Sequence, residues 1–256
     1  MDIREHNQKA WDKLAKDGIE WSLPVSRDVI TAARKGEWQV LLTESKYVPR
    51  AWFPQDMHGV EILCLASGGG QQAPIFAAAG AKVTSFDLSE EQLARDRLVA
   101  EREGLELSIV QGDMRDLSVF TDQTFDLVFH PVSNVFIPDV EPVWWEAYRV
   151  LKHGGTLLAG MTNPLVYCFD PELEERGILQ VKYALPYSDA TSVSKEERER
   201  LFGKEEPIEF SHTLEDLIGG QIAAGFAITG FYESYRAEEV IGQYMPSYFA
   251  TRAVKG

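Results

Sequence analysis

From residue 60 onward, short apolar runs alternate with longer amphipathic stretches. The apolar runs VEILCLA, KVTSFDL, LELSIVQ, FDLVFHPV and TLLAGMT are typical of strands, and most of the stretches between them have helical spacing. This alternation predicts an α/β fold with a parallel sheet and helices on both faces. The runs are apolar at successive positions, as expected for strands that are covered on both sides. Ser89 is a plausible N-cap, so a helix should begin directly after the second strand.

Two parts of the chain depart from this alternation. Residues 1–58 have helical spacing and predict an N-terminal helical extension to a main domain at 59–256. Residues 163–210 are rich in proline and aromatic side chains, and an irregular segment of that length is usually functional or mobile. We therefore expect a lid or substrate-binding insertion there. The pattern resumes with a helix at 213–225 and two further strands.

The composition narrows the range of partners. The chain has 256 residues, of which 45% are hydrophobic and 25% charged, as in an ordinary folded protein. Lysine and arginine number 25 against 40 aspartates and glutamates, so the net charge is −15. This charge disfavours nucleic acids and anionic membrane surfaces as partners.

Cysteine usage and the N-terminus favour a cytoplasmic protein. Two cysteines are too few for a disulfide scaffold, and no Cys and His cluster has the spacing of a metal site. The N-terminal stretch is charged and amphipathic, and no run approaches the length of a membrane span. We expect neither a metal nor a membrane partner, and the oligomeric state stays open.

The stretch LCLASGGGQQAP, residues 63–74, places three glycines between a strand-like run and a predicted helix. A phosphate-binding P-loop needs a Lys-Ser/Thr pair where this chain has two glutamines, so that site is excluded. Gly68, Gly70 and Ala73 fit the dinucleotide pattern G-x-G-x-x-G/A, with Asp87 about 20 residues further on. A tight strand-to-helix crossing without any ligand would use the same glycines.

Five segments, taken in order, resemble the motifs of class I S-adenosylmethionine-dependent methyltransferases. They are ILCLASGGG, VTSFDLS, VQGDMRDL, FDLVFH and YRVLKHGGTLLAG. The resemblance implies a Rossmann-like, doubly wound sheet of seven strands, mostly parallel with an antiparallel last strand. It also implies S-adenosyl-L-methionine as the cofactor and S-adenosyl-L-homocysteine as the product.

The resemblance assigns a role to several residues. Asp87 would bind the ribose, Asp113 would meet the adenine amino group, and Met114 would flank the ring. The residues predicted to bind the cofactor are Ala66, Ser67, Gly68, Gly70, Gln71, Asp87, Leu88, Gly112, Asp113, Met114 and His130. Most of them follow the ends of successive predicted strands, where ligands of open α/β sheets bind. The chain departs from the family at Cys64, where an acid is usual, and at Ala66, where a glycine is usual.

The candidate general base is His130, at the end of the fourth strand, because its ordinary pKa suits proton removal. Alternatively, His130 packs against the cofactor or caps the turn and takes no part in proton transfer. Asn134, Tyr167 and Tyr183 are candidate substrate contacts, and aromatic residues from the N-terminal part and the insertion would roof the site.

The segment HPVSN lacks the Asn/Asp-Pro-Pro-Tyr/Phe pattern of methyltransferases that act on amide and exocyclic amino groups. We therefore predict methyl transfer to a small-molecule acceptor. An NAD-dependent oxidoreductase and a non-catalytic S-adenosylmethionine-binding protein are the alternatives.

Overall fold

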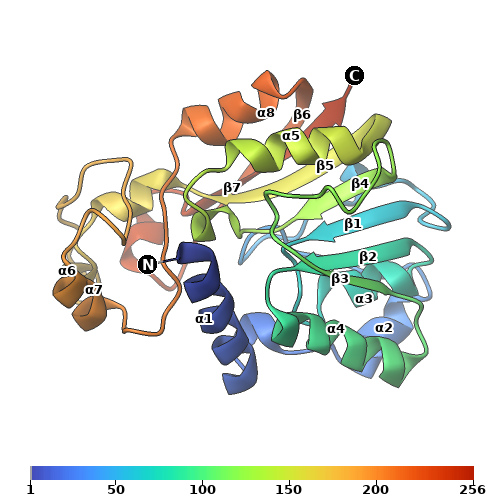
Figure 1. The fold of residues 1–256 in the computed structure, drawn as a ribbon, viewed down its shortest axis with the longest axis horizontal. Helices are drawn as coiled ribbons and strands as arrows, with labels where there is room; N and C mark the ends of the chain where they lie inside the picture. Colours follow the sequence, from blue (N-terminus) through green and yellow to red (C-terminus); the bar gives the residue numbers. More distant parts are fainter. Residues whose placement is uncertain (1) are drawn as a thin grey trace.

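The fold is built on a seven-stranded mixed sheet. In the computed structural model, which describes residues 2–256, the strand order is β3-β2-β1-β4-β5-β7-β6 (Figure 1). Strands β1 to β5 pair in parallel, and β7 runs antiparallel to both β5 and β6. The strands are β1 (Glu61–Leu65), β2 (Lys82–Asp87), β3 (Ser108–Gln111), β4 (Phe125–His130), β5 (Leu151–Thr162), β6 (Phe226–Ser234) and β7 (Tyr248–Lys255). The predicted mostly parallel sheet with an antiparallel last strand is confirmed.

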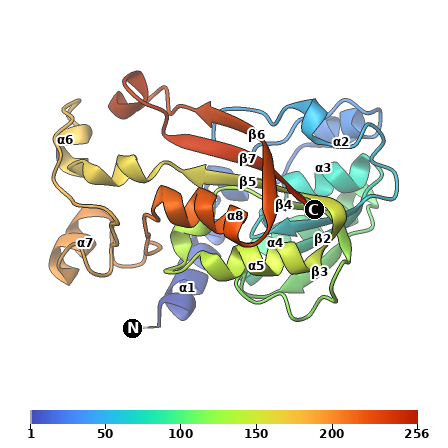
Figure 2. The same ribbon diagram turned by 90° about the horizontal axis from the view of Figure 1, so that it is seen from above.

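Helices cover both faces of this sheet (Figure 2). Ile62 and Cys64 of β1 join a core with α2, α3 and α4, whereas Leu63 and Leu65 join a second core with α5 and α8. Alternate residues of one strand thus enter opposite cores, which is why the strand is apolar at every position. The helices are α1 (Ile3–Asp17), α2 (Arg27–Ala33), α3 (Gln72–Ala78), α4 (Glu90–Glu103), α5 (Glu141–Val150), α6 (Pro171–Glu174), α7 (Lys195–Leu201) and α8 (Gly220–Ala223), the last preceded by a π-helical turn, Glu215–Gly219.

Capping residues set the two ends of α4, and the predicted N-cap, Ser89, is present. The side chain of Ser89 accepts a hydrogen bond from the Gln92 backbone N–H at 3.2 Å, and Gly104 ends the helix with a φ of 63°. Two residues, Leu88 and Ser89, therefore separate β2 from the helix. Asp87 and Gln92 consequently lie at the same edge of the sheet, where both face one cavity.

The N-terminal residues pack into the core of the sheet domain. Val40, Leu42 and Phe53 belong to the same buried cluster as Ile62 of β1. Helix α1 lies against α4 (Figure 1). The expected N-terminal helices are thus present as α1 and α2, while the domain boundary at residue 58 stays a prediction.

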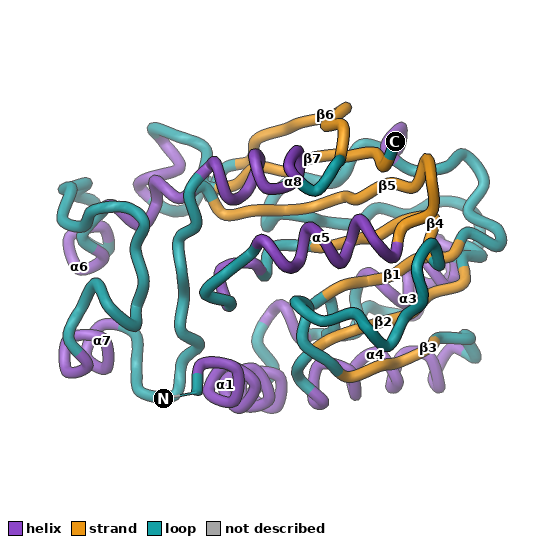
Figure 3. The backbone as a smooth tube through the Cα atoms, turned by 45° about the horizontal axis from the view of Figure 1, so that its top comes forward, coloured by secondary structure: helices purple, strands orange, loops and turns teal. Residues whose placement is uncertain are grey.

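Between β5 and β6 the chain leaves the sheet and forms a lobe of short helices and loops, including α6 and α7 (Figure 3). Asn7 of α1 donates to the backbone oxygens of Phe136 at 2.8 Å and Ile208 at 3.0 Å, and accepts from the Ile208 N–H at 2.8 Å. These bonds connect the N-terminal helix to both the sheet domain and the lobe. Within residues 2–256, no helix is long and apolar enough to cross a membrane.

Candidate active site

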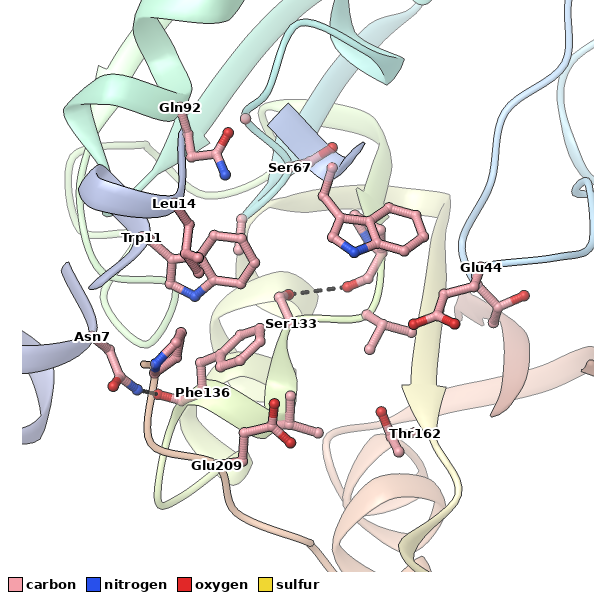
Figure 4. A pocket seen from close by; sticks show the side chains of 18 of the residues that line it. Asn7, Trp11, Leu14, Glu44, Ser67, Gln92, Ser133, Phe136, Thr162 and Glu209 are labelled. Carbon is pink, nitrogen blue, oxygen red and sulfur yellow. Dashed lines mark hydrogen bonds between the residues drawn. The ribbon is translucent and has the colours of Figure 1, made fainter. Parts of the chain in front are cut away.

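A cavity of about 650 Å³ opens at the carboxyl ends of the parallel strands (Figure 4). This volume is in the range of small-molecule pockets, which is roughly 300–1,000 Å³. Nine of the residues predicted to bind the cofactor line it: Ala66, Ser67, Gly68, Gln71, Asp87, Leu88, Gly112, Asp113 and Met114. We call this part of the cavity the strand-end half. The structure therefore brings together residues from the ends of β1, β2 and β3.

Close backbone approaches explain the glycine turn after β1. A Cβ on Gly68 would lie 2.7 Å from the Cβ of Gln92, and a Cβ on Gly69 would lie 2.4 Å from the carbonyl oxygen of Trp21. The Gly68 N–H donates to Asp87 Oδ2 at 3.0 Å. The turn therefore holds β1, β2 and the N-terminal segment together, and it has no room for larger side chains.

A buried carboxylate from α4 holds the glycine turn near Cys64. Asp96 Oδ1 accepts from the Gly70 N–H at 2.8 Å, and Oδ2 accepts from the Ser85 hydroxyl at 2.6 Å. Burial raises the pKa of Asp96 to about 7. Burial, together with Asp96, also raises the pKa of the Cys64 thiol, so this cysteine remains an uncharged core residue. The glycine turn is thus anchored from α4 as well as from β2.

Ala66 stands where the family usually has a glycine, and its backbone is strained. Its φ of 48° lies in the left-handed region, which costs a residue with a Cβ roughly 1–2 kcal/mol. The Ala66 N–H donates to the Phe86 carbonyl oxygen at 2.7 Å and so ties the turn to β2. The turn keeps its shape in spite of the substitution because neighbouring bonds hold it.

The two carboxylates predicted to bind the cofactor are in different electrostatic states. Asp87 accepts from the backbone N–H groups of Gly68 and Ser89, and burial raises its pKa. Asp113 accepts from Arg115 Nε at 3.0 Å and Nη2 at 2.6 Å. Partial burial opposes ionisation of Asp113, but the Arg115 guanidinium outweighs it and lowers the pKa. Asp113 is therefore already ion-paired, whereas Asp87 is held by backbone groups.

Two buried polar atoms in this half have no hydrogen-bond partner among residues 2–256. They are Ser67 Oγ and Gln92 Oε1, on side chains that are each 4% exposed and line the cavity. An unsatisfied buried polar group costs about 1–3 kcal/mol. The strand-end half therefore fits a ligand with polar groups, such as a nucleoside with an amino-acid tail, that would complete these bonds.

His130 lies behind the cavity wall and does not line it. The side chain is fully buried, with Nδ1 2.9 Å from the Leu65 carbonyl oxygen and Nε2 2.6 Å from Asn134 Oδ1. Burial lowers its pKa, which favours the neutral ring. Neither ring nitrogen is free to take a proton from a substrate. The expectation of His130 as general base and cofactor contact is thus corrected: it joins the ends of β1 and β4.

The hydrogen bonds of His130 also define its tautomer. The Leu65 carbonyl can only accept, so Nδ1 carries the proton and Nε2 accepts. Asn134 must then turn its amide nitrogen toward Nε2, and this rotation would also give a partner to Asn134 Nδ2, which otherwise has none in the described part of the chain. Asn134 therefore orients the histidine and does not contact the cavity.

Of the three remaining predicted residues, one lines the cavity and two do not. Gly70 lies outside the cavity, with its N–H on Asp96. Tyr167 lines the cavity and stacks on Tyr187 at 5.6 Å between ring centroids, and Tyr187 packs against Tyr183 at 5.0 Å. The three tyrosines form a row of which only Tyr167 reaches the cavity. Tyr183 supports the wall from behind.

The other part of the cavity, which we call the glutamate half, was not predicted from the sequence except for Tyr167. Its residues are Glu44, Thr162, Tyr167, Glu174, Glu209, Arg236, Glu239 and Tyr248. They come from the N-terminal part, the lobe and the ends of β5, β6 and β7. The positions of two residues could have indicated this half. Thr162 ends β5 and Arg236 follows the end of β6, and because β5 and β6 run in the same direction, both residues lie at the same edge of the sheet.

Hydrogen bonds fix the side chains of the glutamate half. Arg236 forms a two-point ion pair with Glu44, through Nε at 2.8 Å and Nη2 at 2.7 Å. The Tyr248 hydroxyl donates to the same carboxylate, and the Tyr167 hydroxyl donates to Glu209 Oε2 at 2.6 Å. Burial raises the pKa of Glu209. This half therefore presents preorganised carboxylates in a partly dehydrated space.

Aromatic side chains cover the cavity from the N-terminal side. Trp11 packs edge-on against Phe136 at 4.9 Å between centroids (Figure 4). Trp21 also lines the cavity. Trp38 and Trp52, two further aromatic residues of the N-terminal part, pack against Phe53 and Tyr232 and do not line the cavity.

Comparison with known proteins identifies the family. A profile of the methyltransferase domain matches residues 63–159. The chain is 52% identical over 250 residues to the uncharacterized methyltransferase YbaJ of Bacillus subtilis, and the match covers 98% of this chain and 97% of that protein. The chain belongs to the class I S-adenosylmethionine-dependent methyltransferases.

Solved structures show that this methyltransferase shares the fold of other members. An S-adenosylmethionine-dependent methyltransferase from Mesorhizobium loti superimposes with a TM-score of 0.63 at 20% identity, covering 80% of this chain and 95% of that one. A 1,6-didemethyltoxoflavin-N1-methyltransferase from Burkholderia thailandensis gives a TM-score of 0.60 at 14% identity, covering 98% and 88%. That crystal structure contains 1,6-didemethyltoxoflavin and S-adenosylhomocysteine.

The family assignment decides between the alternatives that the glycine turn left open. The protein is a methyltransferase that depends on S-adenosylmethionine, and not an NAD-dependent oxidoreductase. The family assignment therefore confirms S-adenosylmethionine as the cofactor.

Proposed function

We propose that this methyltransferase transfers a methyl group to a small-molecule acceptor bound in the glutamate half of the cavity. The observation that carries the proposal is the continuity of the two halves: residues such as Asp87 and residues such as Glu209 line one space of about 650 Å³. The N-terminal helix and the lobe cover it, which suits a small molecule better than a polymer. The Burkholderia methyltransferase, crystallised with a small acceptor, supports the same class.

In this proposal the strand-end half holds the cofactor. The Asp87 carboxylate accepts from the ribose hydroxyls, and the unpartnered Ser67 and Gln92 atoms bind polar groups of the same ligand. S-adenosylmethionine supplies an activated methyl group on a sulfonium, so the protein's main task is to position the acceptor. Positioning of this kind lowers a barrier by about 7–11 kcal/mol.

The glutamate half orients the acceptor and receives a proton where the acceptor must lose one. Glu209 and Tyr167 form the pair suited to this role, because both line the cavity and share a 2.6 Å hydrogen bond. A carboxyl group whose pKa is raised by burial is a stronger base than an exposed one. This pair replaces His130 as the proposed proton acceptor.

Calorimetric titration of S-adenosylmethionine and S-adenosylhomocysteine tests the cofactor part of the proposal. We expect both to bind the wild-type protein, and we expect Asp87→Asn to weaken binding about 10- to 100-fold, because one charge-assisted hydrogen-bond acceptor is lost. Asp28→Asn, on the exposed surface of α2, serves as the matched control and should leave the affinity unchanged.

Absence of binding by the wild-type protein at millimolar ligand would contradict the proposed function. Equal affinities of wild type and Asp87→Asn would show that the ribose lies elsewhere. Circular dichroism of the variant separates a lost contact from a lost fold.

A further inference from the structure

The charges around the cavity are strongly unbalanced. Eight carboxylates line it: Glu20, Glu44, Asp87, Asp113, Glu174, Glu206, Glu209 and Glu239. Among the described residues, Arg236 is the one cationic side chain that lines it, while Arg115 and Arg4 pair with Asp113 from outside the lining. Fields from like charges in a partly buried cleft add up and select ligands of opposite charge. The cavity therefore repels anions.

Arg236 does not neutralise the glutamate half. Its guanidinium is shared between Glu44 and Glu239, with Nη1 3.1 Å from Glu239 Oε1. Glu209 receives no bond from it. Within residues 2–256, only Oε2 of the Glu209 carboxylate accepts a hydrogen bond, from Tyr167, and Figure 4 shows the Glu209 side chain directed into the cavity. One carboxylate oxygen is thus available to a ligand.

A second, uncharged group points to a ligand at the same place. Thr162, at the end of β5, is nine-tenths buried with 9% of its surface exposed, and it lines the cavity. Its hydroxyl has no hydrogen-bond partner among residues 2–256 and, unlike Ser67 Oγ, is not fully buried. Figure 4 shows this hydroxyl directed toward the region between Glu209 and Glu44. A ligand that donates hydrogen bonds would satisfy both Thr162 and Glu209.

A metal ion is a poor occupant for these carboxylates. No group of three or more His, Cys, Asp or Glu within residues 2–256 has the arrangement of a metal site. The neighbouring walls are apolar and aromatic, formed by side chains such as Trp11, Phe136 and Val166. An organic cation with an apolar body matches both features.

We propose that the methyl acceptor carries a cationic nitrogen group, such as a protonated amine or an amidine, which binds Glu209 and Thr162 while its apolar body packs between the aromatic walls. This proposal rests on the proposed function and adds the chemical class of the acceptor. Glu209 is the specificity-determining residue. The row of Tyr167, Tyr187 and Tyr183 holds its carboxylate in place.

Calorimetry on the complex with S-adenosylhomocysteine tests the proposal. The probes are the cations benzamidine, tyramine and agmatine, the neutral benzamide and the anionic benzoate. We expect at least one cation to bind, benzamide to bind at least about tenfold more weakly than benzamidine, and benzoate not to bind. A charge-assisted hydrogen bond supports a preference of about this size.

Glu209→Gln should weaken cation binding at least about tenfold and leave the affinity for S-adenosylhomocysteine within twofold. Glu101→Gln, on the exposed face of α4, is the matched control and should change neither. Thr162→Val keeps the shape and removes the hydroxyl, so it tests the same site with little risk to folding. It should weaken cation binding severalfold.

The proposal is overturned if no cation binds, if benzamide or benzoate binds as well as benzamidine, or if Glu209→Gln leaves cation affinity unchanged. The proposal is also overturned if Glu209→Gln reduces the preference for S-adenosylmethionine over S-adenosylhomocysteine but leaves the binding of the probes unchanged. That result would show that the negative charge of Glu209 acts on the sulfonium of the cofactor and not on the acceptor. Failure to bind S-adenosylhomocysteine at all would instead contradict the proposed function.

Discussion

At the scale of single residues, the glycine turn shows how a family feature survives the loss of its usual side chains. Cys64 replaces the usual acid, and Asp96 on α4 holds the turn through the Gly70 N–H. The sequence showed the missing acid at Cys64 but not the bond between Asp96 and the turn. The reason is geometric: Asp96 is distant in sequence, and no periodic pattern indicates that its carboxylate enters the core next to β1.

Asp96→Asn should change the pH dependence of stability. Burial raises the pKa of Asp96 from 3.8 to about 7, so the native state resists ionisation that the unfolded chain undergoes near pH 4. The contribution of Asp96 to the free energy of unfolding of the wild-type protein is fully present below about pH 4 and is lost as the pH rises through about 7. The amide can keep the bonds to Gly70 and Ser85. We expect the variant to exceed the wild type in free energy of unfolding by an amount that grows between pH 4 and 7, to at most about 4 kcal/mol.

Urea denaturation at several pH values measures this difference. A constant difference from pH 5 to pH 8 would show that Asp96 does not titrate in this range. Asp122→Asn, on the exposed surface, is the comparison that should show no such trend.

At the scale of elements, α1 acts as a connector between parts of the site. Asn7 is 2% exposed and bonds the backbones of Phe136 and Ile208, one next to the sheet and one in the lobe. The hydrophobic pattern predicted the helix correctly. The pattern did not predict the role of Asn7. A polar residue in a helix is expected to face solvent unless its hydrogen-bond partners are known.

Asn7→Ala should destabilise the closed arrangement of helix and lobe. The substitution leaves two carbonyl groups and one N–H without partners in a buried place, at a cost of about 2 kcal/mol or more. We expect a lower midpoint of denaturation and faster proteolysis in the first 20 residues. Limited proteolysis with and without S-adenosylhomocysteine measures the effect.

Lys9→Ala, on the exposed face of the same helix, should behave as the wild type within about 0.5 kcal/mol. If the two variants are cleaved at the same rate, the bonds of Asn7 do not hold the helix in place.

At the scale of the whole molecule, the sheet was predictable and the glutamate half of the cavity was not. Successive apolar strands and interleaved helices determine a doubly wound sheet, and this places Ser67, Asp87 and Asp113 at one edge. Those residues lie close to strand ends in the sequence itself. Glu44, Glu209 and Arg236 meet only through the folding of the N-terminal part, the lobe and the last strands. No local pattern links three segments that are so far apart.

We propose that one cavity joins a cofactor site at the strand ends to an acceptor site among the glutamates. A crystal structure of the protein with S-adenosylhomocysteine would test this arrangement. We expect the nucleoside in the strand-end half, with its ribose on Asp87 and its sulfur facing the space between Tyr167 and Thr162. Binding outside this cavity, or a sulfur atom separated from Glu209 and Thr162 by the cavity wall, would contradict it.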